Sequence, residues 1–141
     1  MVPPRRRLLG ERGASAVELA FIAPAFVFLI FFCIQAALFF YGRTVAIQAA
    51  REGVSQLRLA PDRESFDQLR PIVLDNTERF ASTVGRESLI QPQATATYDD
   101  AGGRVTVQVR GNVISLLFGI DLSVTEQASG PVERFEPQDL P

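Results

Sequence analysis

The sequence predicts an α+β protein with a single N-terminal transmembrane helix that extends outward, followed by a small domain of one or two helices and a three-stranded antiparallel sheet. Three observations predict this fold. An apolar run extends from Leu19 to Phe40, apolar residues recur at helical spacing between positions 62 and 85, and a period of two begins at position 94. The chain of 141 residues is long enough for one small domain beside the apolar run.

The apolar run is long enough to cross a bilayer. It holds 22 residues without a charge, and Gln35 is its only clearly polar side chain. At 1.5 Å per residue a helix of this length reaches about 33 Å, against a hydrocarbon core of roughly 30 Å. The backbone must satisfy its own hydrogen bonds in lipid, so the crossing form is a helix, and Pro24 near its start is tolerated there.

The charges on both sides of the run set its direction. Arg5, Arg6, Arg7 and Arg12 precede it, with Glu11 as the only acid among residues 1–13. Arginines at the start of a single span hold that end in the cytoplasm, so we expect a plasma-membrane protein whose C-terminal domain is extracytoplasmic. The predicted parts are a basic cytoplasmic leader (1–13), a transmembrane helix (14–42), an extracytoplasmic α+β domain (43–130) and a flexible tail (131–141).

Two other interpretations of the run are weaker. The core helix of a soluble protein rarely stays apolar on all faces for this length. A secretory signal peptide has an apolar core of about 7–15 residues and a cleavage site of small residues. This run is longer, and it ends in Tyr41-Gly42-Arg43, where Tyr41 and Arg43 are typical of residues that anchor a span at the membrane interface.

The composition excludes several kinds of chemistry. The chain has no histidine, and all fourteen basic residues are arginines, so histidine catalysis, histidine metal ligation and lysine Schiff bases are absent. Cys33, the single cysteine, lies in mid-span and should be unreactive. We therefore expect no enzyme, no cofactor, no metal site and no small-molecule substrate. The short arginine patch beside a span also makes nucleic acid an improbable partner.

Glu18 is the unusual residue at the inner edge of the run. A carboxylate near hydrocarbon needs either a route to the headgroups or a cation in the membrane plane. Ala16, Ala20 and Ala23 follow at i, i+4 and i+7, which makes a stripe of small residues where another helix could approach closely. Both features have a plain alternative: a carboxylate that snorkels to the interface, and alanines that simply face lipid.

Several segments of the first 55 residues resemble the TadE-like family. These are pilin-like proteins of the bacterial tight-adherence (Tad, Flp) pilus and secretion apparatus. The segments that carry the resemblance are Arg12-Gly13-Ala14-Ser15-Ala16-Val17-Glu18-Leu19-Ala20, Ala23-Pro24, Tyr41-Gly42-Arg43 and Ala49-Ala50-Arg51-Glu52-Gly53.

The resemblance implies a site. In this family and its pilin relatives a membrane prepilin peptidase cuts after a glycine, and a glutamate follows at the fifth mature position. Carried over, Gly13 precedes the cut, Ala14 becomes the amino terminus, and Glu18 pairs with the new amine of a neighbouring subunit. Major pilins favour an aromatic residue after that glutamate, whereas this chain has Leu19, which favours a minor pilin or pseudopilin.

Two further helical segments follow the span. The first helix is expected to continue outside the membrane from Thr44 to Leu59, weakened by Gly53. Asp62 is a suitable N-cap for a second amphipathic helix that stops at Gly85. Pro71 lies inside it and predicts a kink or two short helices.

The rest of the domain has the pattern of strands. Ala94–Tyr98, Arg104–Arg110 and Leu122–Ala128 each alternate, a Gly-containing turn joins the first two, and the third is expected to pair antiparallel with the second. The apolar stretch 113–120 is too short to span a bilayer. It is either a core loop or short helix over the sheet, or a contact with a partner subunit or the membrane surface.

The sequence thus predicts a membrane-anchored, pilin-like component of a Tad pilus assembly or secretion apparatus. Its partners are expected to be other Tad pilins or pseudopilins, membrane assembly proteins, the prepilin peptidase and the lipid bilayer. The alternative is an uncleaved single-pass protein whose extracytoplasmic domain is a binding module and never joins a filament.

Overall fold

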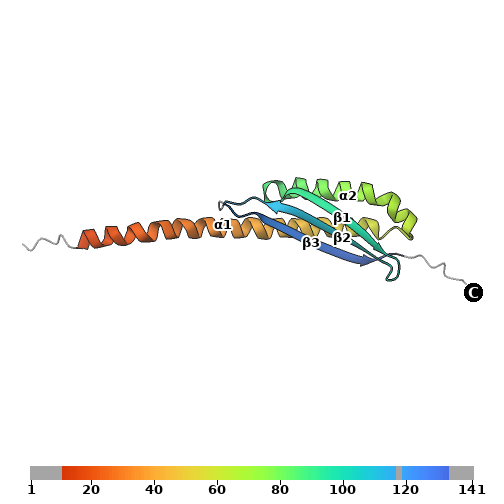
Figure 1. The fold of residues 1–141 in the computed structure, drawn as a ribbon, viewed down its shortest axis with the longest axis horizontal. Helices are drawn as coiled ribbons and strands as arrows, with labels where there is room; N and C mark the ends of the chain where they lie inside the picture. Colours follow the sequence, from red (N-terminus) through yellow and green to blue (C-terminus); the bar gives the residue numbers. More distant parts are fainter. Residues whose placement is uncertain (1–10, 117–118, 134–141) are drawn as a thin grey trace, which may run out of the picture. The chain divides into compact units, whose positions relative to one another are not determined.

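The computed structural model describes residues 11–116 and 119–133, with the backbone alone for residues 11–15. The chain divides into two units between Ile34 and Gln35, and this boundary lies inside the first helix. The helices are α1 (Glu11–Leu57) and α2 (Arg63–Gly85), followed by a short 3-10 turn at Arg86–Ser88. Three strands complete the fold (Figure 1), namely β1 (Ile90–Asp99), β2 (Arg104–Val113) and β3 (Leu122–Pro131). The predicted α+β class is confirmed.

The first unit is the apolar part of α1. Every residue from Ala16 to Ile34 is exposed, including large side chains such as Phe21 and Phe28, and Pro24 lies inside the helix without ending it. Over the described residues this is the one helix long and apolar enough to cross a membrane. A helix that leaves its apolar side chains exposed in water would be unstable, so the segment requires an apolar environment.

The second unit begins with the other half of α1, from Gln35 to Leu57. Its buried face is made of small and medium apolar side chains, because the sheet and α2 pack closely against it. In Figure 1 this half of α1 and α2 lie on one face of the sheet. The opposite face of the sheet is polar and exposed, as the alternating burial of β2 requires.

Helix α2 begins where the sequence predicts. The side chain of Asp62 accepts a hydrogen bond from the backbone N–H of Ser65 at 2.8 Å, which is an N-cap, and the helix ends at Gly85. The expectation of two short helices meeting at Pro71 is wrong, since α2 is continuous through it. Pro71 is exposed, so water can satisfy the carbonyl that loses its partner, while packing continues on the buried face of α2. That face consists of Phe66, Val73, Thr77, Ala81 and Gly85.

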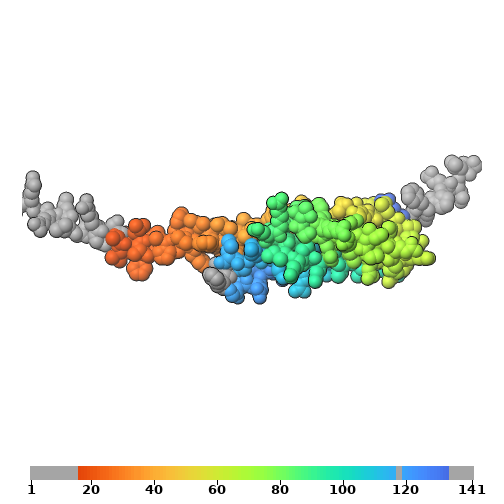
Figure 2. Space-filling view, turned by 90° about the horizontal axis from the view of Figure 1, so that it is seen from above, coloured from red at the N-terminus to blue at the C-terminus, as the bar shows by residue number. Residues whose placement is uncertain are grey.

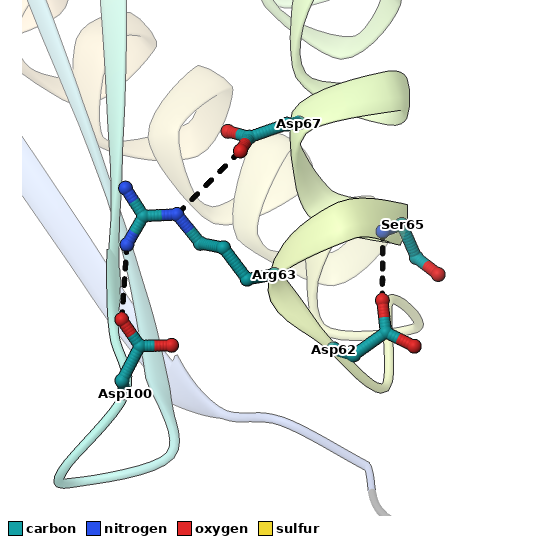
Figure 3. Close-up of polar contacts among 5 residues, drawn as sticks. All are labelled: Asp62, Arg63, Ser65, Asp67 and Asp100. Carbon is teal, nitrogen blue, oxygen red and sulfur yellow. Dashed lines mark hydrogen bonds and ion pairs between the residues drawn. The ribbon is translucent and has the colours of Figure 1, made fainter.

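The start of α2 also contacts the turn between β1 and β2. Arg63 lies between two carboxylates (Figure 3), with Nη1 at 3.0 Å from Asp100 Oδ2 and Nε at 3.6 Å from Asp67 Oδ2. All three side chains are more than half exposed, so each pair contributes at most about 1 kcal/mol. These surface pairs therefore add little to the stability of the domain.

The three strands form an antiparallel sheet in the order β1-β2-β3. Asp99 pairs with Arg104 at one end of the first hairpin, and Val113 pairs with Leu122 at the opposite end of the second. The pairing of the third strand with the second is therefore confirmed. Strand β1 starts at Ile90, four residues before the predicted Ala94. Its register shifts between Ile90 and Gln93, where Gln91 has a φ of 49° in the left-handed region.

One core joins the sheet and both helices of the second unit. Phe66 of α2 packs on Tyr98 of β1 with ring centroids 5.3 Å apart. The fully buried members come from all of these elements, and the largest are Phe66, Leu57, Leu89, Val45, Val105, Val107 and Val109. The core interpretation of the stretch 113–120 fits Val113, which is buried in β2, whereas Ile114, Leu116 and Ile120 are exposed.

Candidate functional site

The predicted assembly residues lie in the exposed helical segment 11–34. Ala16, Ala20 and Ala23 are all exposed, and their spacing places them on one face of α1. Glu18 is exposed as well and has no ion pair or hydrogen bond with any part of the chain that the structure describes. The pairing of Glu18 with an amine and the close approach of another helix to the alanines stay predictions.

The expected cleavage point lies in the first turn of α1. The helix begins at Glu11, so Arg12, Gly13 and Ala14 are helical by backbone, and their side chains are outside the description. The predicted topogenic cluster Arg5–Arg7 also lies outside the described residues, as do residues 134–141 of the predicted tail. The first turn of a helix lacks its full set of backbone hydrogen bonds, so opening it at Gly13 breaks few of them.

Gln35 is a functional position that sequence reasoning missed. It is the one polar side chain of the apolar run, and only 5% of it is exposed. Its Nε2 donates to the carbonyl oxygen of Ile114 at 3.1 Å, and its Oε1 accepts from the N–H of Leu116 at 2.7 Å. The carboxamide thus satisfies a donor and an acceptor of the β2–β3 loop, and it marks where α1 becomes part of the domain. A lone polar residue in an apolar run was the available signal.

A stripe of small residues on α1 was also missed. Gly42, Ala46, Ala49, Ala50 and Gly53 are all buried. A Cβ at Gly42 would lie 2.6 Å from the carbonyl oxygen of Ser88, and a Cβ at Gly53 would lie 2.9 Å from Thr77 Oγ1. The glycines therefore permit the sheet and α2 to pack close to α1. From the sequence, Gly53 was expected only to weaken the helix, whereas the structure shows that close packing requires a glycine there. The signal in the sequence was the helical spacing of small residues, at steps of four, three and four from Gly42 through Ala46 and Ala49 to Gly53.

Tyr41 and Arg43 make contacts within the domain. Tyr41 is half exposed, and its hydroxyl donates to the carbonyl oxygen of Val84 at 3.2 Å. The Arg43 guanidinium forms an ion pair with Glu126 of β3. Both side chains thus tie α1 to the domain. The interfacial anchoring expected from the sequence stays a prediction.

The described residues contain no group of three His, Cys, Asp or Glu side chains placed to hold a metal ion. The pKa of Asp62 is lowered, mainly by the hydrogen bond from the backbone N–H of Ser65 and further by the Ser65 side chain. This is the electrostatic signature of a helix cap and serves folding. The described residues therefore offer an exposed apolar helix in the first unit and a packed α+β domain in the second.

These features define a single-pass membrane-anchored protein with a small α+β domain. The comparison with protein families agrees: residues 13–55 match the family model described as TadE-like protein, which confirms the resemblance over that segment. The matched segment contains Gly13, Glu18, Gln35 and the small-residue stripe of α1. No curated protein and no solved structure matches the chain. The domain beyond residue 55 is thus described by its structure alone.

Proposed function

We propose that this protein is a minor pseudopilin: a membrane-anchored, pilin-like structural component of a Tad pilus assembly or secretion apparatus. The observation that carries the proposal is Glu18. It is a carboxylate without a partner in the described chain, set in an exposed apolar helix, inside the segment that matches the TadE-like family. We assign the protein a structural role; over the residues that the structure describes, no nucleophile is paired with a base in a reactive arrangement.

The packing of α1 supports a deeper membrane position for Glu18 than the apolar run alone suggests. Leu38 and Phe39, which the sequence assigns to the span, pack against the core of the domain, and Gln35 is buried there. The lipid-exposed part of α1 then ends near Ile34, and a hydrocarbon core of roughly 30 Å reaches back about 20 residues from it. On this register Glu18 lies inside the inner boundary of the hydrocarbon, where an unpaired carboxylate is unfavourable.

Cleavage after Gly13 would supply the missing cation. It removes a leader with a formal charge of +3 and leaves an ammonium at Ala14, four residues before Glu18. In an assembly of parallel helices, the ammonium of one subunit can lie beside Glu18 of the next. Pairing then offsets the desolvation of both groups and fixes the axial register of the subunits.

The small residues of the same segment suit such an assembly. Because Ala16, Ala20 and Ala23 share one face, a second helix can approach there more closely than beside phenylalanine. We assign this face to contact with other Tad pilins or pseudopilins. The arginines of the leader keep the amino terminus in the cytoplasm, so the α+β domain lies on the extracytoplasmic side of the plasma membrane.

Co-assembly of Glu18 variants tests the proposal. Glu18→Ala and Glu18→Gln remove the charge and should strongly reduce recovery of the protein with its partner pilins, whereas Glu18→Asp should retain part of it. Ser15→Ala is the control for a substitution in the same stretch. Membrane insertion and topology, measured by protease accessibility of the domain, should be the same in all variants. Equal recovery of Glu18→Ala and the unmodified protein would instead favour an uncleaved, membrane-anchored binding module.

A further inference from the structure

The two ends of the α+β domain differ sharply in polarity. The turn between β1 and β2, with Asp99 and Asp100, and the start of α2 form a charged end. The strand register puts the segment between β2 and β3 at the opposite end of the sheet, and its described residues near position 120 are the light-blue group at one end of the domain in Figure 2. There, Ile90, Ile114, Leu116 and Ile120 are 37–46% exposed. We call these four residues the apolar tip.

Three residues of the apolar tip, Ile90, Ile114 and Ile120, line an open cavity of about 620 Å³. The lining is mixed: Val113 and Leu122 add apolar groups from the strand ends, and Asn112, Ser115 and Asp121 add polar ones. No charged residue occurs from Gly111 to Ile120, and Asp121 is the first acid after this stretch. An exposed apolar surface of this kind at one end of a small domain marks a contact with a partner or a membrane.

The position of Gln35 indicates what the apolar tip contacts. Its carboxamide holds the backbone of Ile114 and Leu116, and it is the residue that directly follows the exposed apolar part of α1. The tip is therefore attached at the point where α1 leaves the lipid. Its backbone groups at 114 and 116 are bonded to a protein side chain, which reduces their need for water.

We infer that the apolar tip enters the outer interface of the same bilayer that α1 crosses, so that the domain rests on the membrane at a second point beside its helix. The inference depends on the proposed membrane anchoring. Leu116 and Ile120 provide the apolar contact, and Asp121 remains among the headgroups. A loop of apolar residues without charges is suited to the boundary between headgroups and acyl chains.

Fluorescent labels on single cysteines test the inference. The full chain is reconstituted in vesicles of phosphatidylethanolamine and phosphatidylglycerol and labelled with an environment-sensitive dye at Leu116→Cys or Ile120→Cys, each in a Cys33→Ala background. Both positions should show blue-shifted emission and quenching by lipids with a nitroxide near the headgroup. Leu59→Cys is the matched control, because Leu59 is 62% exposed and follows Gln35 by more than twenty helical residues. It should show neither effect.

A label on the native Cys33 distinguishes a failure of the tip contact from a failure of the membrane anchoring of α1. Cys33 lies two residues before Gln35, so a label there should be quenched by lipids with a nitroxide on the acyl chain just below the headgroups. If it is quenched in this way while labels at 116 and 120 behave as in water, the tip inference is wrong and the anchor stands. If Cys33 is also in water, the anchoring itself is wrong. Blue-shifted emission at 116 and 120 without lipid quenching would mean that protein covers the tip, which also overturns the inference. Gln35→Ala should weaken the lipid quenching at 116.

Discussion

Gly53 of α1 lies so close to Thr77 of α2 that a Cβ atom at position 53 would be 2.9 Å from the Thr77 hydroxyl oxygen. The same Cβ would be 3.1 Å from Cγ1 of Val107 on β2. Both neighbours are buried and attached through short side chains, so neither can move away easily. This glycine is the point where the membrane-anchored helix, the second helix and the sheet meet.

Gly53→Ala should therefore destabilise the domain, although alanine is the better helix former. Overpacking costs about 1–3 kcal/mol, and the higher helix propensity of alanine offsets about 1 kcal/mol of that. We expect a net loss of up to about 2 kcal/mol in the free energy of unfolding, measured by urea denaturation of the full chain in detergent micelles. Ser55→Ala, at an exposed position of the same helix, should leave stability unchanged or slightly higher. Equal behaviour of the two variants would contradict this packing.

Thr77→Val should have the opposite effect. The Thr77 hydroxyl oxygen is buried and has no hydrogen-bond partner among the described residues, so its desolvation is not compensated. Valine keeps the branched shape and removes the polar atom, and we expect a gain of about 1 kcal/mol in the same denaturation experiment. Thr83→Val on the exposed side of α2 is the control and should change little. A clear loss of stability at position 77 would show that the hydroxyl has a partner.

Gln35→Leu tests the link between α1 and the β2–β3 loop. Leucine fits the apolar run but leaves the carbonyl oxygen of Ile114 and the N–H of Leu116 without their partner. We expect a loss of about 1–3 kcal/mol in the unfolding free energy. The same substitution at Gln48, which is exposed on α1, should be nearly neutral. A loss at position 48 as large as at position 35 would argue against a specific role of the two hydrogen bonds.

The stability of the domain should depend on pH through Asp62. Its folded pKa is lowered from 3.8 by the hydrogen bond from the Ser65 N–H, so its stabilising effect is fully present above the unfolded value. The effect is lost as the pH falls through the lowered folded value. Asp62→Asn retains a capping oxygen without a titrating group, so the difference in thermal midpoint between the two proteins should shrink below about pH 4. A constant difference from pH 3 to 7 would contradict this assignment.

The sequence predicts the segments whose pattern is local. Arg104–Arg110 alternates without interruption, and β2 contains it. The apolar residues from Phe66 onward have helical spacing, so α2 is recovered with its cap at Asp62. Strand β1 is predicted too short because its first residues do not follow a regular strand pattern: Pro92 is unusual in a strand, and Gln91 has a left-handed φ at the irregularity between Ile90 and Gln93.

The roles of Gln35 and Gly53 depend on residues far away in the sequence. Gln35 bonds to Ile114 and Leu116 across about eighty positions, and Gly53 packs against Thr77 and Val107. No local pattern contains these partners. The role proposed for Glu18 has a different basis, because it rests on a charge at the edge of an apolar run and on the family resemblance. The structure adds the point, near Ile34, where the fully exposed part of α1 ends.

The most direct test of the account is the intact mass of the protein purified from the membrane of its own cells. We predict a mature chain that begins at Ala14, without the thirteen-residue leader, because the proposed pairing of Glu18 needs the amine at Ala14. A membrane-bound protein that retains residues 1–13 in full would contradict it.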